Sequence, residues 1–252
     1  MSGHSHAANI KHKKAAADAK KGKLFSRWAK AIMIAARNGG GNPDANLALR
    51  YALDKAKEVG MPRDTADRAI KKGSGELGGE TIVEVAYEGF GAGGVALIAE
   101  CVTDNKNRVS SEIRKIFETK GGRVGAPGSC AWMFEKRGVL SIPQSAAPEE
   151  EVMTLALDSG ADDMQVLDGA YEILTAPETF EAVRKAVEDR GWKPEVAEVL
   201  LLPKNKVEVT DPKVARKVLE LVESLEEHDD VQNVVTNQDI SDEVAAAARA
   251  AT

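Results

Sequence analysis

The sequence is poor in the residues that build disulfide frameworks and metal sites. Among its 252 residues are two cysteines, Cys101 and Cys130, and both fall in apolar segments typical of strands. Two thiols do not make a disulfide framework, so we expect both to be buried and reduced. His4, His6 and His12 lie near one another, but no cysteine or carboxylate accompanies them at ligand spacing, and we expect no metal there.

Long apolar runs are also missing. The longest uncharged apolar run near the start, Ala31–Ala36, is far too short to span a bilayer. Residues 1–23 are polar and rich in lysine without an apolar segment, which excludes a secretory signal and favours the cytoplasm. Aromatic residues make up 4% of the chain and none precedes Phe25, so base stacking is not expected in the opening segment.

Motifs of catalysis are absent as well. No Gly-x-Ser-x-Gly or His-Glu-x-x-His sequence occurs. The glycine-rich turn 88–94 joins two predicted strands and lacks Gly-Lys-Ser/Thr, so it predicts a tight hairpin and not a phosphate-binding loop. We therefore expect neither an enzyme nor a cofactor or small-molecule substrate.

What the chain does have is strongly segregated charge. Residues 1–75 hold 16 Lys and Arg against 6 Asp and Glu, whereas residues 76–252 hold 18 against 34. The overall charge of −6 hides this division. Clustered cations bind phosphates with release of counterions, so a nucleic acid is the first partner to expect.

The strongest candidate site is a run of cations in the first 27 residues. In a helix, Lys13, Lys20 and Arg27 recur every seven residues and share one face, which would follow a phosphate backbone without reading bases. The alternative is a solvated face, although such faces normally mix both signs. The residues expected to neutralise phosphates are Lys11, Lys13, Lys14, Lys20, Lys21, Lys23 and Arg27.

Secondary phosphate contacts are predicted at Lys71, Lys72 and Arg108. Arg108 ends the segment Thr103-Asp-Asn-Lys-Asn-Arg, which follows a strand and opens a helix, where backbone N–H groups bind anions. The alternative is that Asn107 or Asp104 caps this helix.

Periodicity predicts three short helices in the first 75 residues. The first begins near Leu24 and ends at the glycines 39–41, with Trp28 on its apolar side. The second is expected to start at Asn42 as cap with Pro43 in its first turn, and the third to run from Pro62 to Ile70. A glycine-rich linker follows.

Strands dominate the next part. They are predicted at Ile82–Tyr87, Val95–Val102 and Cys130–Phe134, with a helix around Val109–Phe117. Residues 204–238 supply a further helix, from Pro212, and the strand Val231–Thr236. We therefore predict a discontinuous middle α/β domain, formed by residues 80–136 and 204–238.

Residues 137–203 have a βαββαβ rhythm, the ferredoxin-like pattern, with helices predicted at Pro148–Ser159 and Pro177–Arg190. This inserted domain holds 5 Lys and Arg against 14 Asp and Glu, and Tyr171 is its one candidate for an exposed ring on a strand. Because phosphate would be repelled, protein contact is the better interpretation. The predicted class is α+β with four parts: 1–75 basic arm and helices, 80–136 with 204–238, 137–203, and an alanine-rich tail 239–252 that we expect to fray.

Several ordered motifs identify a family resemblance. Those in the first 75 residues are Asn9-Ile-Lys-His-Lys-Lys, Ala35-Ala-Arg-Asn-Gly-Gly-Gly, Met61-Pro-Arg-Asp and Arg68-Ala-Ile-Lys-Lys-Gly. Later come Tyr87-Glu-Gly-Phe-Gly, Thr103-Asp-Asn-Lys-Asn-Arg and Val231-Gln-Asn-Val. The chain resembles the YebC/PmpR family from residue 1 to about 238. Where that family usually has Lys-Trp, this chain has His6-Ala7, so a cation and a ring are missing at the tip.

The resemblance implies three domains, namely a helical one, a middle α/β one and an inserted ferredoxin-like one. Members of the family are described as transcriptional regulators that bind DNA. Mitochondrial relatives resemble translational activators, and a ribosome-associated role has been proposed for bacterial members, with rRNA or tRNA as the ligand. The charge pattern suits both functions, so both remain open at this point.

Overall fold

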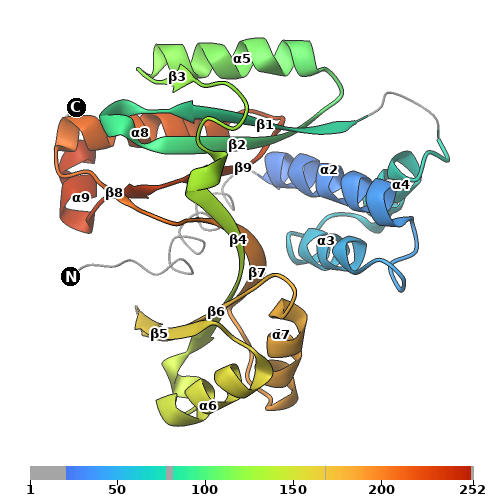
Figure 1. The fold of residues 1–252 in the computed structure, drawn as a ribbon. Coiled ribbons are helices and arrows are strands. Elements are labelled where there is room, and N and C mark those ends of the chain that lie inside the picture. The colour runs from blue at the N-terminus through green and yellow to red at the C-terminus, as the bar shows by residue number, and fades with distance from the viewer. Residues whose placement is uncertain (1–20, 78–81, 168, 251–252) are drawn as a thin grey trace. The chain divides into compact units, whose positions relative to one another are not determined.

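The computed structural model describes residues 21–77, 82–167 and 169–250 (Figure 1). Within these residues the chain divides into two compact units. One runs from Phe134 to Lys204, and the other combines the residues up to Met133 with those from Asn205 onward. The predicted α+β class is confirmed, because a helical region comes first and mixed helix and sheet follow.

Three helices form the N-terminal region: α2 (Lys21–Gly39), α3 (Leu47–Glu58) and α4 (Arg63–Gly73). Alanines fill much of the space between them, with Ile32 and Leu49 fully buried, and Trp28 packs against this core as predicted. A Cβ at Gly73 would lie 2.2 Å from the carbonyl oxygen of Met33. Glycine is therefore needed there for α4 to approach α2.

The start of α3 differs from the prediction. Residues 42–45 form a turn and the cap is Asn46, whose side chain accepts a hydrogen bond from the Leu49 N–H (3.1 Å). The Asn46 amide also donates to the carbonyls of Ala35 (2.7 Å) and Gly40 (2.8 Å). Asn46 is the cap because its one buried amide group makes hydrogen bonds with backbone groups at the end of α2 and at the beginning of α3.

A four-stranded sheet of order β3-β1-β2-β9 forms the middle of the same unit. Its strands are β1 (Val83–Phe90), β2 (Ala96–Thr103), β3 (Arg123–Val124) and β9 (Val231–Thr236). The β1–β2 turn has positive φ at Gly93 (69°) and Gly94 (77°), as the predicted hairpin requires. β9 pairs with β2, so a strand from beyond residue 204 completes a sheet begun before residue 134.

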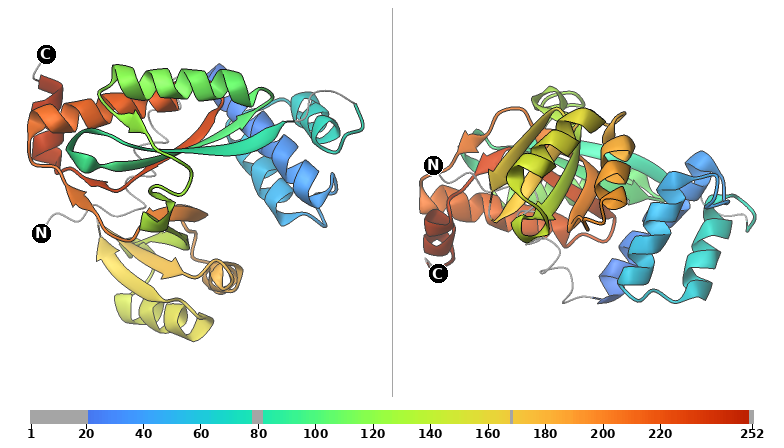
Figure 2. Two further views of the ribbon diagram at one scale, coloured as in Figure 1. Left: turned by 45° about the horizontal axis from the view of Figure 1, so that its top comes forward. Right: turned by 90° about the horizontal axis from the view of Figure 1, so that it is seen from below.

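Two helices cover one face of this sheet, α5 (Lys106–Thr119) and α8 (Pro212–Glu226), and they contact each other in one core, as the left view of Figure 2 shows. Their apolar stripes meet β2 in one core, in which Ile113, Phe117 and Leu221 are fully buried. The helix positions follow directly from the 3.6-residue period of the sequence.

The predicted strand Cys130–Phe134 is wrong. The third strand of this sheet is β3, and residues Ala131–Met133 form a 3₁₀ turn (η2). The cause is Glu88, 8% exposed, whose carboxylate accepts hydrogen bonds from the backbone N–H groups of Gly128 (2.6 Å), Cys130 (2.7 Å) and Ala131 (2.7 Å). Donors that point at one side chain cannot pair in a strand ladder.

Replacing Glu88 by glutamine is expected to lower the free energy of unfolding by about 1–3 kcal/mol, because one amide oxygen replaces a charged acceptor of three hydrogen bonds. Urea unfolding measures this, and Glu84→Gln, at an exposed position of the same strand, is the control. Burial alone would raise the pKa of Glu88, but the three N–H donors more than offset this and the pKa lies below its ordinary value.

The sign of the pH dependence follows from that shift. The stabilisation by Glu88 is fully present above the unfolded-state pKa of ~4.3 and is lost as the pH falls through the lower folded-state pKa. The difference between the natural protein and Glu88→Gln should therefore shrink in acid. A difference that stays constant down to the lowest pH at which the protein folds would contradict this account.

The second unit contains β4 (Phe134–Pro143), η3 (Gln144–Ala146), α6 (Glu149–Ser159), β5 (Asp163–Leu167), β6 (Ala170–Thr175), α7 (Phe180–Asp189) and β7 (Val196–Pro203). The sheet order is β5-β6-β4-β7 with antiparallel neighbours, which is the ferredoxin-like topology predicted from the βαββαβ rhythm. α7 begins three residues later than predicted, after a turn at 177–179.

The expected fraying of the tail is not seen up to residue 250. A short parallel pair, β8 (Val207–Glu208) and β10 (Gln238–Asp239), leads into α9 (Asp242–Ala250). Ala248 is 2% exposed and belongs to the same core as α8. The high helix propensity of alanine predicts a helix here, and the packing of this helix against α8 stabilises it.

Candidate nucleic-acid interface

The outward face of α4 presents three exposed cations, Arg68, Lys71 and Lys72. Their spacing of three and four residues places them on one face, opposite the buried Ala66 and Ala69. No ion pair of these three cations occurs among the residues that the structure describes. Lys71 and Lys72 were expected from the sequence, whereas Arg68 was missed, although its spacing from them would have identified it.

The cations of α2 divide into two groups. Arg27 is exposed, as a phosphate contact requires. Lys30, 17% exposed, forms an ion pair with Asp230 and also donates to the carbonyl of Asp229 (2.8 Å). Arg37 donates to the carbonyl of Ile82. Lys30 and Arg37 therefore hold α2 to the rest of its unit.

The other expected cations fall outside this description. Lys11, Lys13, Lys14 and Lys20 precede the described residues. Lys21 and Lys23 lie in the first turn of α2, but their side chains are not part of the description. Their role as phosphate contacts stays a prediction from the sequence.

Arg108 lies among carboxylates. Its guanidinium contacts Asp230 (2.5 Å), Glu112 (3.0 Å) and Asp104 (3.5 Å). The hydrogen bond to Asp230 is the main cause of a pKa of Arg108 above its ordinary value. A phosphate here would meet three negative groups, so the geometry favours a structural role for Arg108 over the expected contact.

Asp230 is the centre of this arrangement. Its side chain is 8% exposed and contacts Lys30, Arg108 and the Thr103 hydroxyl (3.3 Å). Burial alone would raise the pKa of Asp230, but the hydrogen bonds from Lys30 and Arg108 more than offset this, and the pKa lies below its ordinary value. We call Lys30, Asp230 and Arg108 the Asp230 cluster.

The start of α5 is capped by a residue that the sequence did not single out. Asn105 accepts a hydrogen bond from the Arg108 N–H (3.0 Å), and its own N–H donates to Thr103 Oγ1 (3.0 Å). The two residues that the sequence offered as possible caps, Asn107 and Asp104, do not cap the helix. Of the two interpretations of this segment, helix capping and phosphate binding, the geometry favours capping.

Tyr171, the candidate for an exposed ring in the ferredoxin-like unit, is buried. This side chain is 4% exposed and its hydroxyl donates to the carbonyl of Ala147 (3.0 Å), so it belongs to the core beneath α6 and α7. Acidic residues of α7 pair locally, as in Arg184–Glu181 (2.8 Å) and Lys185–Asp189 (2.6 Å). A buried ring at position 171 is not accessible for stacking with a base.

Both cysteines are buried, as predicted, and the structure has no disulfide between them. Burial raises the pKa of Cys101 to about 12 and also raises that of Cys130, so neither is a thiolate at neutral pH. Within the described ranges, no group of three or more His, Cys, Asp or Glu side chains is arranged to hold a metal ion.

Family models match almost the whole chain. Residues 5–76 match the TACO1/YebC protein N-terminal domain, and residues 82–238 match the TACO1/YebC second and third domain. The chain belongs to the TACO1/YebC family.

Individual relatives agree with this membership. A "probable transcriptional regulatory protein" of Dictyoglomus turgidum is 51% identical over 245 residues, which cover 97% of this chain and 98% of the relative. One of the same name from Syntrophomonas wolfei is 49% identical over 250 residues, covering 98% and 100%. The crystal structure of a conserved hypothetical protein from Aquifex aeolicus superposes with a TM-score of 0.80 at 42% identity, covering 90% of this chain and 94% of that one.

The Dictyoglomus and Syntrophomonas relatives carry the name of regulatory proteins. Transcription regulation is thus the activity named within this TACO1/YebC family. In the part of the chain that the structure describes, the helices are too short or too polar to cross a membrane.

Proposed function

We propose that this TACO1/YebC protein regulates gene expression by binding DNA through its basic N-terminal arm and helices, without catalytic turnover. The observation that carries this proposal is the segregation of charge, with 16 basic against 6 acidic residues in the first 75 and the reverse balance beyond. The names of the relatives support a role in transcription. Such a role places the protein in the cytoplasm.

The contacts fall into two sets. The arm and the first turns of α2 supply Lys11, Lys13, Lys14, Lys20, Lys21, Lys23 and Arg27. The face of α4 supplies Arg68, Lys71 and Lys72, which are exposed and point away from the helical core. These side chains bind phosphates, which sets affinity and position but not base sequence.

The acidic unit has a separate role in this proposal. Residues 137–203 carry a balance of −9, and α6 exposes Met153 (40%) and Leu157 (59%) beside its acidic first turn. This surface would repel phosphate and contact proteins, and it limits indiscriminate binding to polyanions.

Electrostatic binding has a defined signature in salt. If the arm neutralises about six phosphates, it should contribute about −5 to the slope of log Kobs against log salt on duplex DNA, since each contact contributes about −0.9. Fluorescence anisotropy with a labelled duplex at increasing KCl measures this slope. A flat response would remove the proposed mechanism.

The nature of the nucleic acid needs a second experiment. Crosslinking the full protein in cells and sequencing the attached nucleic acid should recover DNA near promoters. Recovery of rRNA or tRNA in its place would support the alternative of a ribosome-associated translation factor, and would overturn the DNA proposal while keeping the basic surface as the site.

A further inference from the structure

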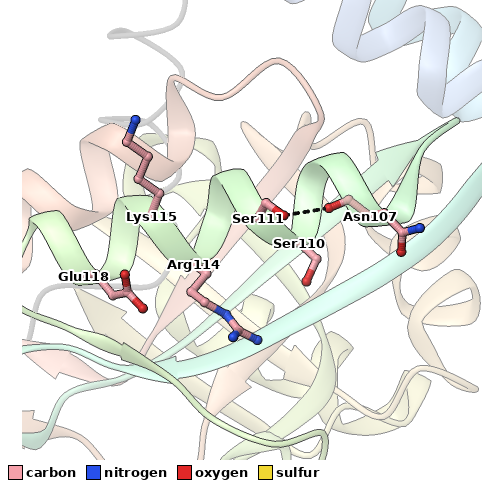
Figure 3. Close-up of a pocket in the computed structure, with 6 residues that line it drawn as sticks. All are labelled: Asn107, Ser110, Ser111, Arg114, Lys115 and Glu118. Atoms are coloured by element: carbon pink, nitrogen blue, oxygen red, sulfur yellow. Dashed lines mark hydrogen bonds between the residues drawn. The ribbon is translucent and has the colours of Figure 1, made fainter.

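The outer face of α5 carries a polar stripe that the proposed function does not yet use. Asn107, Ser110, Ser111, Arg114, Lys115 and Glu118 line a shallow pocket along it (Figure 3). The opposite side of the helix is anchored by Val109, Ile113 and Phe117, each with no exposed surface. The stripe is therefore held on a rigid support.

Several other cations of this unit are engaged within the fold. Arg108 contacts three carboxylates, Lys120 pairs with Glu220 (3.6 Å), and Arg123 lies over the Phe90 ring (5.6 Å). Arg114 and Lys115 are exposed, and the described residues provide no ion-pair partner for either. Figure 3 shows their side chains leaving α5 on opposite flanks.

The composition of the stripe favours one kind of ligand. Arg, Lys, Ser and Asn side chains are the donors that contact phosphate and sugar oxygens. Protein interfaces are depleted in Lys and Ser and enriched in aromatic, Met and Arg side chains, and of these favoured types the stripe holds Arg114 but no aromatic or Met side chain. Glu118 is its one carboxylate, and it limits how many phosphates the stripe accepts.

We propose that the α5 stripe is a second contact for a nucleic-acid backbone, centred on Arg114 and Lys115. This inference rests on the proposed function and extends it to a new element. The stripe belongs to the same compact unit as α2 and α4, and the Asp230 cluster joins the start of α5 to α2. Arg114 lies about 9 Å along the helix from Arg108. One polyanion can thus be bound by both surfaces.

The test uses the full chain with Arg114→Gln and Lys115→Gln together, because glutamine keeps helix propensity and removes the charges. On labelled duplex DNA the slope of log Kobs against log salt should become shallower by about 1.8, and affinity at ~0.1 M salt should fall roughly 10–100-fold. The same titration with an rRNA hairpin of equal phosphate number shows which nucleic acid the stripe prefers.

The matched control is Lys213→Gln with Lys217→Gln on α8, two exposed cations of the same unit that lie outside the α5 stripe. This control should leave the slope unchanged. An equal loss in both variants, or an unchanged slope in the α5 variant while the natural protein keeps its steep one, overturns the inference and leaves the proposed function standing. A flat slope in the natural protein overturns both.

Discussion

Replacing Lys30 and Arg108 together by alanine is expected to lower the free energy of unfolding by about 3–5 kcal/mol. Asp230 is 8% exposed, and these two cations are its charged partners among the described residues. Without them the buried carboxylate keeps the hydrogen bond from the Thr103 hydroxyl (3.3 Å), but no described cation balances its charge. The loss is large because a charge left in a low-dielectric environment keeps its desolvation penalty.

A rescue variant separates this effect from lost packing. Adding Asp230→Asn to the double variant removes the buried charge and should restore most of the stability in urea unfolding. Arg63→Ala with Arg68→Ala is the control, because both side chains are exposed and Arg63 has 93% of its surface in water. A double variant within ~1 kcal/mol of the natural protein, or a rescue that restores nothing, would refute the role of the cluster.

The largest effect on binding is expected from the arm. Changing Lys11, Lys13, Lys14, Lys20, Lys21 and Lys23 to glutamine in the full chain should lower affinity for duplex DNA by about 10⁴–10⁵-fold at ~0.1 M salt, if each lysine neutralises a phosphate. The slope of log Kobs against log salt should lose about 5 at the same time. Anisotropy titrations at several salt concentrations measure both quantities.

A control of equal charge is available elsewhere in the chain. It changes Lys185, Lys193, Lys204, Lys206, Lys213 and Lys217 to glutamine. If binding follows the arm, this control loses little; if it follows net charge alone, the two variants weaken equally. An arm variant that retains its affinity within tenfold would end the proposed mechanism.

Hydrophobic periodicity predicted the helices and strands that are held mainly by apolar contacts with the core. The strand Val231–Thr236 was predicted with its observed bounds, and α8 and the ferredoxin-like rhythm agree within a few residues. In these segments a side chain needs only to be apolar on the correct side, so a period of two or of 3.6 residues contains the necessary information.

The failures share one cause, a side chain that acts on a distant backbone. Glu88 turned the predicted strand Cys130–Phe134 into a turn by accepting hydrogen bonds from residues 40 to 43 positions away. Asn46 became the cap of α3 because it also closes α2. Tyr171, the one candidate for an exposed ring on the inserted sheet, lies in the core, where its hydroxyl donates to the carbonyl of Ala147.

The amino-acid order by itself determined the family, the α+β class and the separation of positive from negative residues, since composition and short-range spacing carry all three. The tertiary structure decided which cations remain available to a ligand. Arg108 and Arg114 look equivalent along one helix, yet Arg108 meets Asp230 from 122 positions away whereas Arg114 faces solvent. Ion pairing depends on distances in space, and the linear sequence does not contain those distances.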